Sequence, residues 1–151
     1  MSGTPDYHAT ALGGKFDPRR FFELARTVGH GKALGLEFHG AGSDWVELAL
    51  PWREQLVGVA ETGVLASGAI VSLVDTCGGT AVWQALGHFQ PIVTIDLRLD
   101  YLRPALKGET VFARCTCDKL TRQIAFVSGI AHTGDEARPV ARAVGTFMLK
   151  P

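Results

Sequence analysis

The chain has 151 residues, of which 46% are hydrophobic, so it can fold as one domain around a substantial core. Its 15 Lys and Arg residues balance its 15 Asp and Glu residues, and no basic stripe or acidic tail stands out. We therefore expect neither nucleic acid nor a membrane surface as a partner.

Residues 1–16 are polar and lack the basic and apolar regions of a secretory signal. We expect this segment to be mobile, residues 17–151 to form a single domain, and the protein to be cytoplasmic. Pro18 predicts the first turn of a helix that ends near Gly29 or Gly31.

Two alternating segments follow and predict a hairpin. In the second, Val46, Leu48 and Leu50 are expected to face the core, with Glu47 on the opposite face. After an irregular connection, an apolar run predicts a long helix over residues 66–86. Further alternating segments complete the chain. The strands are expected at about residues 34–39, 45–50, 93–101, 110–120, 123–133 and 140–149.

Residues 93–101 alternate clearly: Val93, Ile95 and Tyr101 share one face, and Thr94 lies on the other. Strands joined by hairpins form antiparallel sheets, so the order of elements predicts an α+β fold. We expect an antiparallel sheet of about six strands wrapped around one long central helix, with an N-terminal helix in front.

Asp75 is the only charged side chain between Glu61 and Asp96. A buried carboxylate without a partner is costly, so we expect Asp75 to be paired, exposed at a cleft or used in chemistry. Helical spacing places it on a face of mostly small residues, opposite the bulky stripe that contains Leu73 and Cys77. The residues alone leave a catalytic and a structural role open.

The cysteines Cys77, Cys115 and Cys117 lack Cys-x-x-Cys spacing, and the five histidines form no metal-binding motif. We therefore predict free core thiols and neither a structural nor a catalytic metal. Free thiols are typical of a reducing compartment.

Four motifs follow one another along the chain. They are Glu61-Thr-Gly-Val-Leu before the long helix, Asp75 within it, Asp100-Tyr-Leu-Arg-Pro104 after the next strand, and Gly145-Thr-Phe-Met in the last strand. In this order they resemble the PaaI-like (phenylacetate-degradation) hotdog-fold thioesterases. The resemblance covers residues 30–150 or so. It implies a homodimer or homotetramer in which paired central helices lie side by side, with acyl-CoA sites at the interface.

The resemblance further implies hydrolysis of an acyl-CoA thioester to a free acid and CoA, without a separate cofactor. Asp75 of one subunit is implied to act as nucleophile or as general base, and both readings stay open. The implied oxyanion donor is backbone N–H at the helix start of the other subunit, at Ser67 and Gly68. Thr94 matches the hydroxyl residue that orients the water or the carboxylate.

The chain departs from the family pattern at two places. The His-Gly-Gly at the helix start is replaced by Ala66-Ser-Gly, and the usual asparagine aligns near Val59 or Ala60. Val59 and Ala66 therefore occupy substrate-binding positions without the polar side chains of the family. Arg103 and Arg122 are candidates to bind CoA phosphates, with solvated surface charges as the alternative.

The residues also bear on functions other than hydrolysis. The main alternative is a catalytically weak acyl-CoA-binding or structural hotdog protein in which Asp75 is an interface residue. A hydratase is disfavoured because no histidine lies near Asp75 in sequence or at the helix start. A serine hydrolase is disfavoured because Ser67 lacks the Gly-x-Ser-x-Gly pattern, and its hydroxyl is predicted to cap the helix. Trp52, Trp83 and Phe89 are candidates to line an acyl pocket, with core packing as the alternative.

Overall fold

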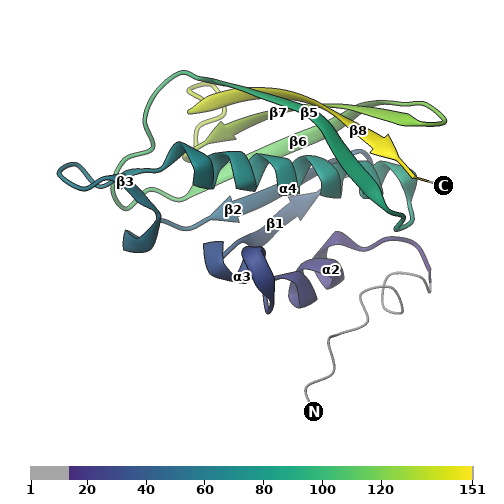
Figure 1. Ribbon diagram of the computed structural model, residues 1–151, viewed down its shortest axis with the longest axis horizontal. Coiled ribbons are helices and arrows are strands. Elements are labelled where there is room, and N and C mark those ends of the chain that lie inside the picture. The colour runs from purple at the N-terminus through teal and green to yellow at the C-terminus, as the bar shows by residue number, and fades with distance from the viewer. Residues whose placement is uncertain (1–13, 151) are drawn as a thin grey trace, which may run out of the picture.

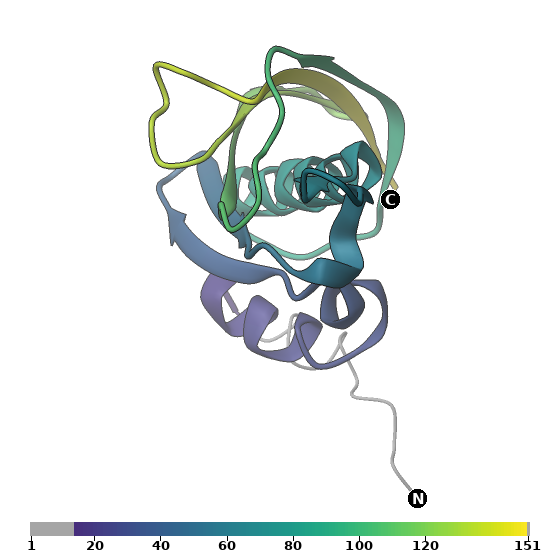
Figure 2. The same cartoon turned by 90° about the vertical axis from the view of Figure 1, so that its left-hand side faces the viewer.

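One antiparallel sheet wraps around one long helix, in a computed structural model that describes residues 14–150 (Figure 1). The elements are α2 (Pro18–Ala25), α3 (Gly29–Leu34), β1 (Glu37–Ala41), β2 (Trp45–Leu50), η1 (Glu54–Leu56), β3 (Val57–Val59), β4 (Val64–Leu65), α4 (Ser67–Leu86), β5 (Ile92–Tyr101), β6 (Val111–Leu120), β7 (Ile124–His132) and β8 (Ala141–Leu149). The main sheet has six strands in the order β1-β2-β6-β7-β8-β5, and β3 pairs with β4 separately. Figure 2 looks along α4 and shows the sheet curving around it, with α2 and α3 below. The predicted α+β fold is confirmed.

The central helix and the strands after it begin and end within one residue of their predicted positions. Their periods are unambiguous in the sequence, because an apolar run of this length fits a helix and strict alternation fits a strand. The region before β1 differs from the prediction.

Two short helices form where one was expected. The hydroxyl of Thr27 donates to the Leu24 carbonyl at 2.7 Å and its N–H donates to the same oxygen at 3.0 Å, which closes α2. Gly35 ends α3 with a φ of 71°, in the left-handed region. The first strand therefore begins at Glu37 rather than at Leu34.

The segment expected to be mobile, residues 1–16, lies outside the described residues as far as residue 13. Its last residue, Phe16, is buried, and the Phe16 N–H donates to the Gly87 carbonyl at 2.9 Å. This bond ties the start of α2 to the end of α4.

β5 departs from strict alternation at Ile95. Thr94 and Asp96 pair with consecutive residues of β8, so Ile95 is an extra, bulged residue. Thr94 consequently faces α4, whereas Val93 and Ile95 are 42% and 52% exposed. The expectation that Val93 and Ile95 share the face of Tyr101 is therefore wrong, because the bulge shifts the alternation by one residue.

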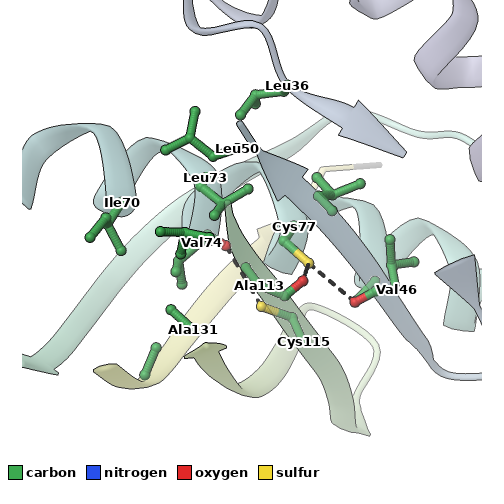
Figure 3. Packing of buried hydrophobic residues seen from close by; sticks show 14 of the residues in the cluster. Leu36, Val46, Leu50, Ile70, Leu73, Val74, Cys77, Ala113, Cys115 and Ala131 are labelled. Atoms are coloured by element: carbon green, nitrogen blue, oxygen red, sulfur yellow. Dashed lines mark hydrogen bonds between the residues drawn. The ribbon is translucent and has the colours of Figure 1, made fainter. Parts of the chain in front are cut away.

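α4 buries its bulky stripe against the sheet, as helical spacing predicts (Figure 3). The residues of this stripe, each at most 2% exposed, are Ile70, Leu73, Val74, Cys77 and Ala81. The Cys77 thiol lies 3.2 Å from the Val46 carbonyl and 3.1 Å from the Ala113 carbonyl. A Cβ at Gly78 would lie 3.1 Å from the Phe147 ring, so the last strand packs closely on this part of the helix.

The three cysteines are buried and free, as predicted. The hydrogen bond between Cys115 and Cys77, together with burial, raises the pKa of Cys115 well above its usual value, so the Cys115 thiol stays protonated. The cysteines therefore act as small core side chains.

Among the described residues, α4 is the one helix that is long and apolar enough to cross a membrane. Within its apolar stretch, 56% is buried inside the protein. Packing inside the sheet accounts for the apolar composition of α4.

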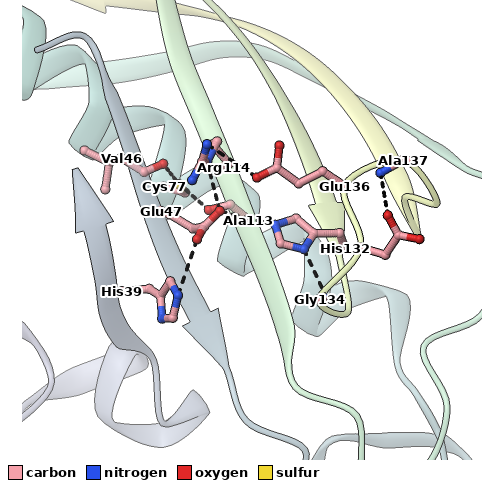
Figure 4. Close-up of polar contacts among 11 residues, drawn as sticks. His39, Val46, Glu47, Cys77, Ala113, Arg114, His132, Gly134, Glu136 and Ala137 are labelled. Carbon is pink, nitrogen blue, oxygen red and sulfur yellow. Dashed lines mark hydrogen bonds and ion pairs between the residues drawn. The ribbon is translucent and has the colours of Figure 1, made fainter. Parts of the chain in front are cut away.

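Glu47 lies on the outer face of β2, as alternation predicts, but it is buried there, with 5% of its surface exposed (Figure 4). Its carboxylate accepts hydrogen bonds from Arg114 Nε at 3.0 Å and from His132 Nε2 at 3.2 Å. The Gly134 N–H donates to Nδ1 of His132 at 3.2 Å, which leaves the proton of the neutral ring on Nε2. Arg114 also pairs with Glu136 at 3.4 Å. The hydrogen bonds from Arg114 and His132, which lie on other strands, thus offset the cost of burying the Glu47 carboxylate.

Glu47, His132 and Glu136 bring possible metal ligands within 4.8 Å of one another. However, Arg114 already contacts both carboxylates. Nε2 of His132 carries the ring proton and therefore has no lone pair with which to bind a metal ion. The chemistry of the group is that of an ion-pair network, not that of a cation site.

We predict that Glu47→Ala lowers the free energy of unfolding by about 3 kcal/mol, because it leaves the Arg114 and His132 donors short of their acceptor. This is the lower end of the range for breaking a buried pair, since Arg114 keeps Glu136. Urea unfolding measures the loss. Glu37→Ala, on the exposed side of neighbouring β1, is the control and should change stability by less than about 0.5 kcal/mol. Equal losses in the two variants would contradict the prediction.

Candidate active site

Asp75 lies half-buried on α4, on the side that faces residues of α2, α3 and β5. Thr94 Oγ1 donates to Asp75 Oδ1 at 2.8 Å. The bulge at Ile95 places the Thr94 side chain on the α4 side of β5. Two residues that the sequence singled out are thereby brought together, and the carboxylate is held in one orientation.

A cavity of about 300 Å³ opens beside Asp75. It follows α4 from Asp75 to Trp83, and Ile92 and Thr94 of β5 form part of its wall. Side chains of α2 and α3 close the side opposite the sheet. Asp75 therefore faces a lined cavity, and Gly79, one helical turn further along α4, is buried in the wall of that cavity.

Of the three aromatic residues predicted to line an acyl pocket, two lie at the cavity or next to it, and one lies elsewhere. Trp83 lines the cavity, and Phe89 packs on the Trp83 ring with centroids 4.7 Å apart. Trp52 lies elsewhere, with its Nε1–H donating to the Gly63 carbonyl at 2.8 Å.

His30 is a residue of this site that the sequence reasoning missed. It lies on α3, lines the same cavity as Asp75, and its Nε2 is 3.0 Å from Ser72 Oγ. Ser72 precedes Asp75 by one helical turn. A separation of 42 residues hides this contact from motif spacing, and a prediction of α3 would have been needed to find it.

The start of α4 presents free backbone donors. Ala66 is the N-cap and offers no side-chain cap, so the expected capping role of the Ser67 hydroxyl is wrong: Ser67 is the first helical residue. Within residues 14–150, no hydrogen-bond acceptor meets the N–H groups of Ser67 and Gly68. Tyr101 from β5 donates its hydroxyl to the Ser67 carbonyl at 2.9 Å. These N–H groups, at the positive end of the helix dipole, suit a negatively charged oxygen.

The proposed oxyanion donor and the carboxylate are far apart within one chain. Ser67 and Asp75 are separated by eight residues of α4, which is about 12 Å along the helix axis. A single thioester carbonyl cannot contact both, so a site that uses both needs a second copy of the chain.

Val59 and Ala66 gather at the helix start. The Ala66 N–H donates to the Leu56 carbonyl at 2.8 Å, and a Cβ on Gly58 would lie 2.8 Å from Ala66 Cα. Val59 is 44% exposed beside them, on β3. Ala66 therefore directly precedes the free N–H of Ser67, and Val59 lies on the neighbouring strand β3.

The two candidate arginines lie at opposite ends of the sheet. Arg103 follows β5 near the helix start, where its Nη2 donates to Thr133 Oγ1 at 2.8 Å and its Nε donates to the Arg138 carbonyl at 3.1 Å. Its guanidinium thus clamps the β7–β8 loop. Arg122 is exposed in the β6–β7 turn, beside the C-terminal end of β8.

A protein-family model described as the thioesterase superfamily matches residues 62–140. The match starts just before α4 and ends just before β8. It therefore contains Asp75, Thr94 and the start of α4, and it leaves out α2 and α3.

Known proteins resemble the chain over most of its length. The medium/long-chain acyl-CoA thioesterase YigI of Escherichia coli is 28% identical over 131 residues, which cover 78% of this chain and 83% of YigI. The crystal structure of thioesterase HI1161 from Haemophilus influenzae has a TM-score of 0.80 at 25% identity, covering 91% of this chain and 93% of the other. The phenylacetic acid degradation protein PaaI from Thermus thermophilus, solved as a mutant, has a TM-score of 0.67 at 26% identity, covering 78% and 95%. The chain spans 64% and 63% of the length of two further curated relatives, from Haemophilus influenzae and Pseudomonas aeruginosa.

We predict that Tyr101 ionises at higher pH in the folded than in the unfolded protein, because partial burial raises its pKa, against the hydrogen bond with Ser67. The folded pKa exceeds the unfolded value of about 10, so stability falls as the pH rises above that value. The chain has two tyrosines. In Tyr7→Phe, the ultraviolet titration of Tyr101 should have a higher midpoint than the same protein in denaturant. Coincident midpoints would refute this.

Proposed function

The chain belongs to the thioesterase superfamily, and from that premise we propose that it hydrolyses an acyl-CoA thioester to a free acid and CoA. The observation that carries the proposal is the Asp75 carboxylate, which Thr94 holds at 2.8 Å at the mouth of a cavity. A carboxylate fixed in a poorly solvated site can attack a carbonyl carbon or deprotonate a water that attacks it.

Both versions of the reaction use the same groups. In the first, an Asp75 oxygen bonds to the thioester carbon, the C–S bond breaks, and water then hydrolyses the resulting anhydride. In the second, Asp75 takes a proton from water, the hydroxide adds to the carbon, and the CoA thiol leaves with a proton. Each passes through a tetrahedral oxyanion, which backbone N–H groups stabilise. Asp75 and these donors supply the chemistry, so the proposed reaction needs no metal or cofactor.

The oxyanion donors are proposed to come from Ser67 and Gly68 of a second subunit. β5 lies at the end of the strand order and is 10 residues long, so its outer edge is a template for pairing with another copy. On the adjoining open side of α4, Val71 is 39% exposed. Pairing of β5 edges would set two α4 helices side by side and bring each helix start toward the other subunit's Asp75. A homodimer is the smallest such assembly, and a tetramer would join two of them.

The remaining assignments belong to the same proposal. Val59 and Ala66 border the helix start and are proposed to contact the substrate there, and Arg122 is proposed to contact CoA phosphates. Arg103 is proposed to act through the loop that it clamps. The buried free thiols support a reducing, cytoplasmic location.

We expect Asp75→Asn to lower kcat/KM for acyl-CoA hydrolysis by about 10²- to 10⁴-fold, because the amide is neither a base nor a nucleophile. Release of free thiol from a panel of aryl, short and medium-chain acyl-CoAs measures the rate. Asp96→Asn, an exposed carboxylate on the outer face of β5, is the matched control and should retain activity. Equal rates for wild type and Asp75→Asn would refute the assignment. If that variant instead lost its dimer, the structural role of Asp75 would be supported.

We expect Ser67→Pro to fold normally and lose activity. Proline is favoured at the first helical position and removes only the N–H, and Ala66, with ψ of 133°, already has the conformation that precedes proline. Ser67→Ala keeps the N–H and should stay active, which makes it the control. An active Ser67→Pro variant would exclude this donor.

Mixing subunits tests whether the site is shared. Ser67→Pro and Asp75→Asn proteins, unfolded and refolded together, should regain about a quarter of wild-type activity, since half of the dimers are mixed and each mixed dimer holds one intact site. Each variant refolded alone is the control. Absence of recovery, with mixed dimers present, would contradict a site shared between Asp75 of one subunit and Ser67 of the other.

A further inference from the structure

The cavity beside Asp75 has its polar groups at one end. Asp75, Thr94 and His30 lie at this end, where the carboxylate and the imidazole can be reached. From there the cavity follows α4 for eight residues to Trp83, a distance of about 12 Å. A ligand that fits must carry a polar group at one end and an extended part beyond it.

The inner part of the cavity is apolar although two threonines line it. Thr76 Oγ1 donates to the Ser72 carbonyl and Thr80 Oγ1 donates to the Thr76 carbonyl, each at 2.7 Å. Because both hydroxyls are engaged with the helix backbone, each threonine can offer its methyl group to the cavity. Phe22 and Phe147 complete this inner lining. An aliphatic chain therefore meets no unsatisfied polar group there.

The far end of the cavity is closed by aromatic rings. Trp83 packs against Phe21 of α2 with centroids 5.1 Å apart and against Phe16 at 5.8 Å. The Trp83 Nε1–H donates to the Gln90 carbonyl at 2.8 Å, which fixes the ring. The Trp83 ring is therefore held in one position and closes this end of the cavity.

The opposite wall belongs to the N-terminal segment. Asp17 caps α2 by accepting from the backbone N–H groups of Arg19 and Arg20 at 2.9 and 3.3 Å, and the Phe16 N–H holds the end of α4. α2 and α3 precede the residues 62–140 that match the superfamily. These two helices therefore lie outside the matched segment, which carries Asp75.

We propose that α2, together with Trp83, closes an acyl pocket and sets the length of the chain it accepts, a medium-length unbranched aliphatic acyl group. This rests on the proposed thioester hydrolysis. A phenylacetyl group placed at Asp75 is too short to reach Trp83, whereas a much longer chain meets the aromatic wall. Each further methylene buried in the pocket should raise kcat/KM about fourfold until the wall is reached.

The test compares butyryl-, octanoyl-, phenylacetyl- and palmitoyl-CoA on the full chain. Ala25 lines the cavity from α2, so Ala25→Phe fills part of the space that an acyl chain would occupy. We expect the ratio of kcat/KM for octanoyl-CoA to kcat/KM for butyryl-CoA to fall at least tenfold in this variant. Glu23→Phe adds the same ring on the exposed side of α2 and should keep the wild-type order, which peaks at octanoyl-CoA.

A second variant guards against misfolding of the first. A Cβ on Gly79 would lie 3.4 Å from Ile92 and 3.6 Å from Phe147, which is ordinary contact, so Gly79→Ala should fold and narrow the pocket. Thermal unfolding is recorded for both variants. If Ala25→Phe does not fold, a selective loss of octanoyl-CoA hydrolysis in Gly79→Ala supports the proposal, and an unchanged order overturns it.

Calorimetric binding of free octanoate separates the pocket from the reaction. Octanoate binding that Ala25→Phe or Gly79→Ala weakens, without any thioester turnover in the wild type, would sink the proposed function and leave the pocket standing. Turnover with phenylacetyl-CoA as the best substrate, or with the same order in wild type and pocket variants, would overturn the pocket. Absence of both turnover and octanoate binding would overturn both.

Discussion

The enclosure of α4 by the sheet is the constraint on which the rest of the structure depends. A helix of 20 residues is stable inside a curved sheet only if the surfaces that meet are apolar, so its polar groups must gather on the side that stays open. The carboxylate of Asp75 lies on this open side. Because the Leu73 and Cys77 side is packed against the sheet, a carboxylate on this helix is restricted to the open side by packing alone, whether or not it takes part in catalysis.

The same enclosure keeps α4 straight and rigid, and so keeps its two candidate catalytic groups apart. The N–H groups of Ser67 and the carboxylate of Asp75 are held rigidly apart by the helix between them. No loop movement within one chain can bring them together. This geometry makes self-association a requirement of the proposed reaction. The outer edge of β5, the last strand in the sheet order among the described residues, is the proposed place for it.

The sequence predicted what depends on local periodicity and missed what depends on distant partners. α4 and the four strands after it follow from an apolar run and from alternation, because each pattern decides its own structure. The burial of Glu47 depends on Arg114 and His132 of other strands, and alternation carries no information about them. His30 joined the site through α3, a short helix with weak local signals. Ser67 was placed one position too early because a serine near a helix start is as compatible with the first turn as with the cap.

The extra residue in β5 changes which side chains of this strand point toward α4. Thr94 and Tyr101 are seven positions apart, an odd number, and an unbroken strand would point them to opposite faces. Both nevertheless reach α4, Thr94 at Asp75 and Tyr101 at the Ser67 carbonyl, since the bulge at Ile95 adds one step between them. A single inserted residue thus lets one strand serve both ends of the helix. Without the bulge, a β5 strand could point only one of these two side chains toward α4, so the two ends of the helix could not both be contacted by this strand.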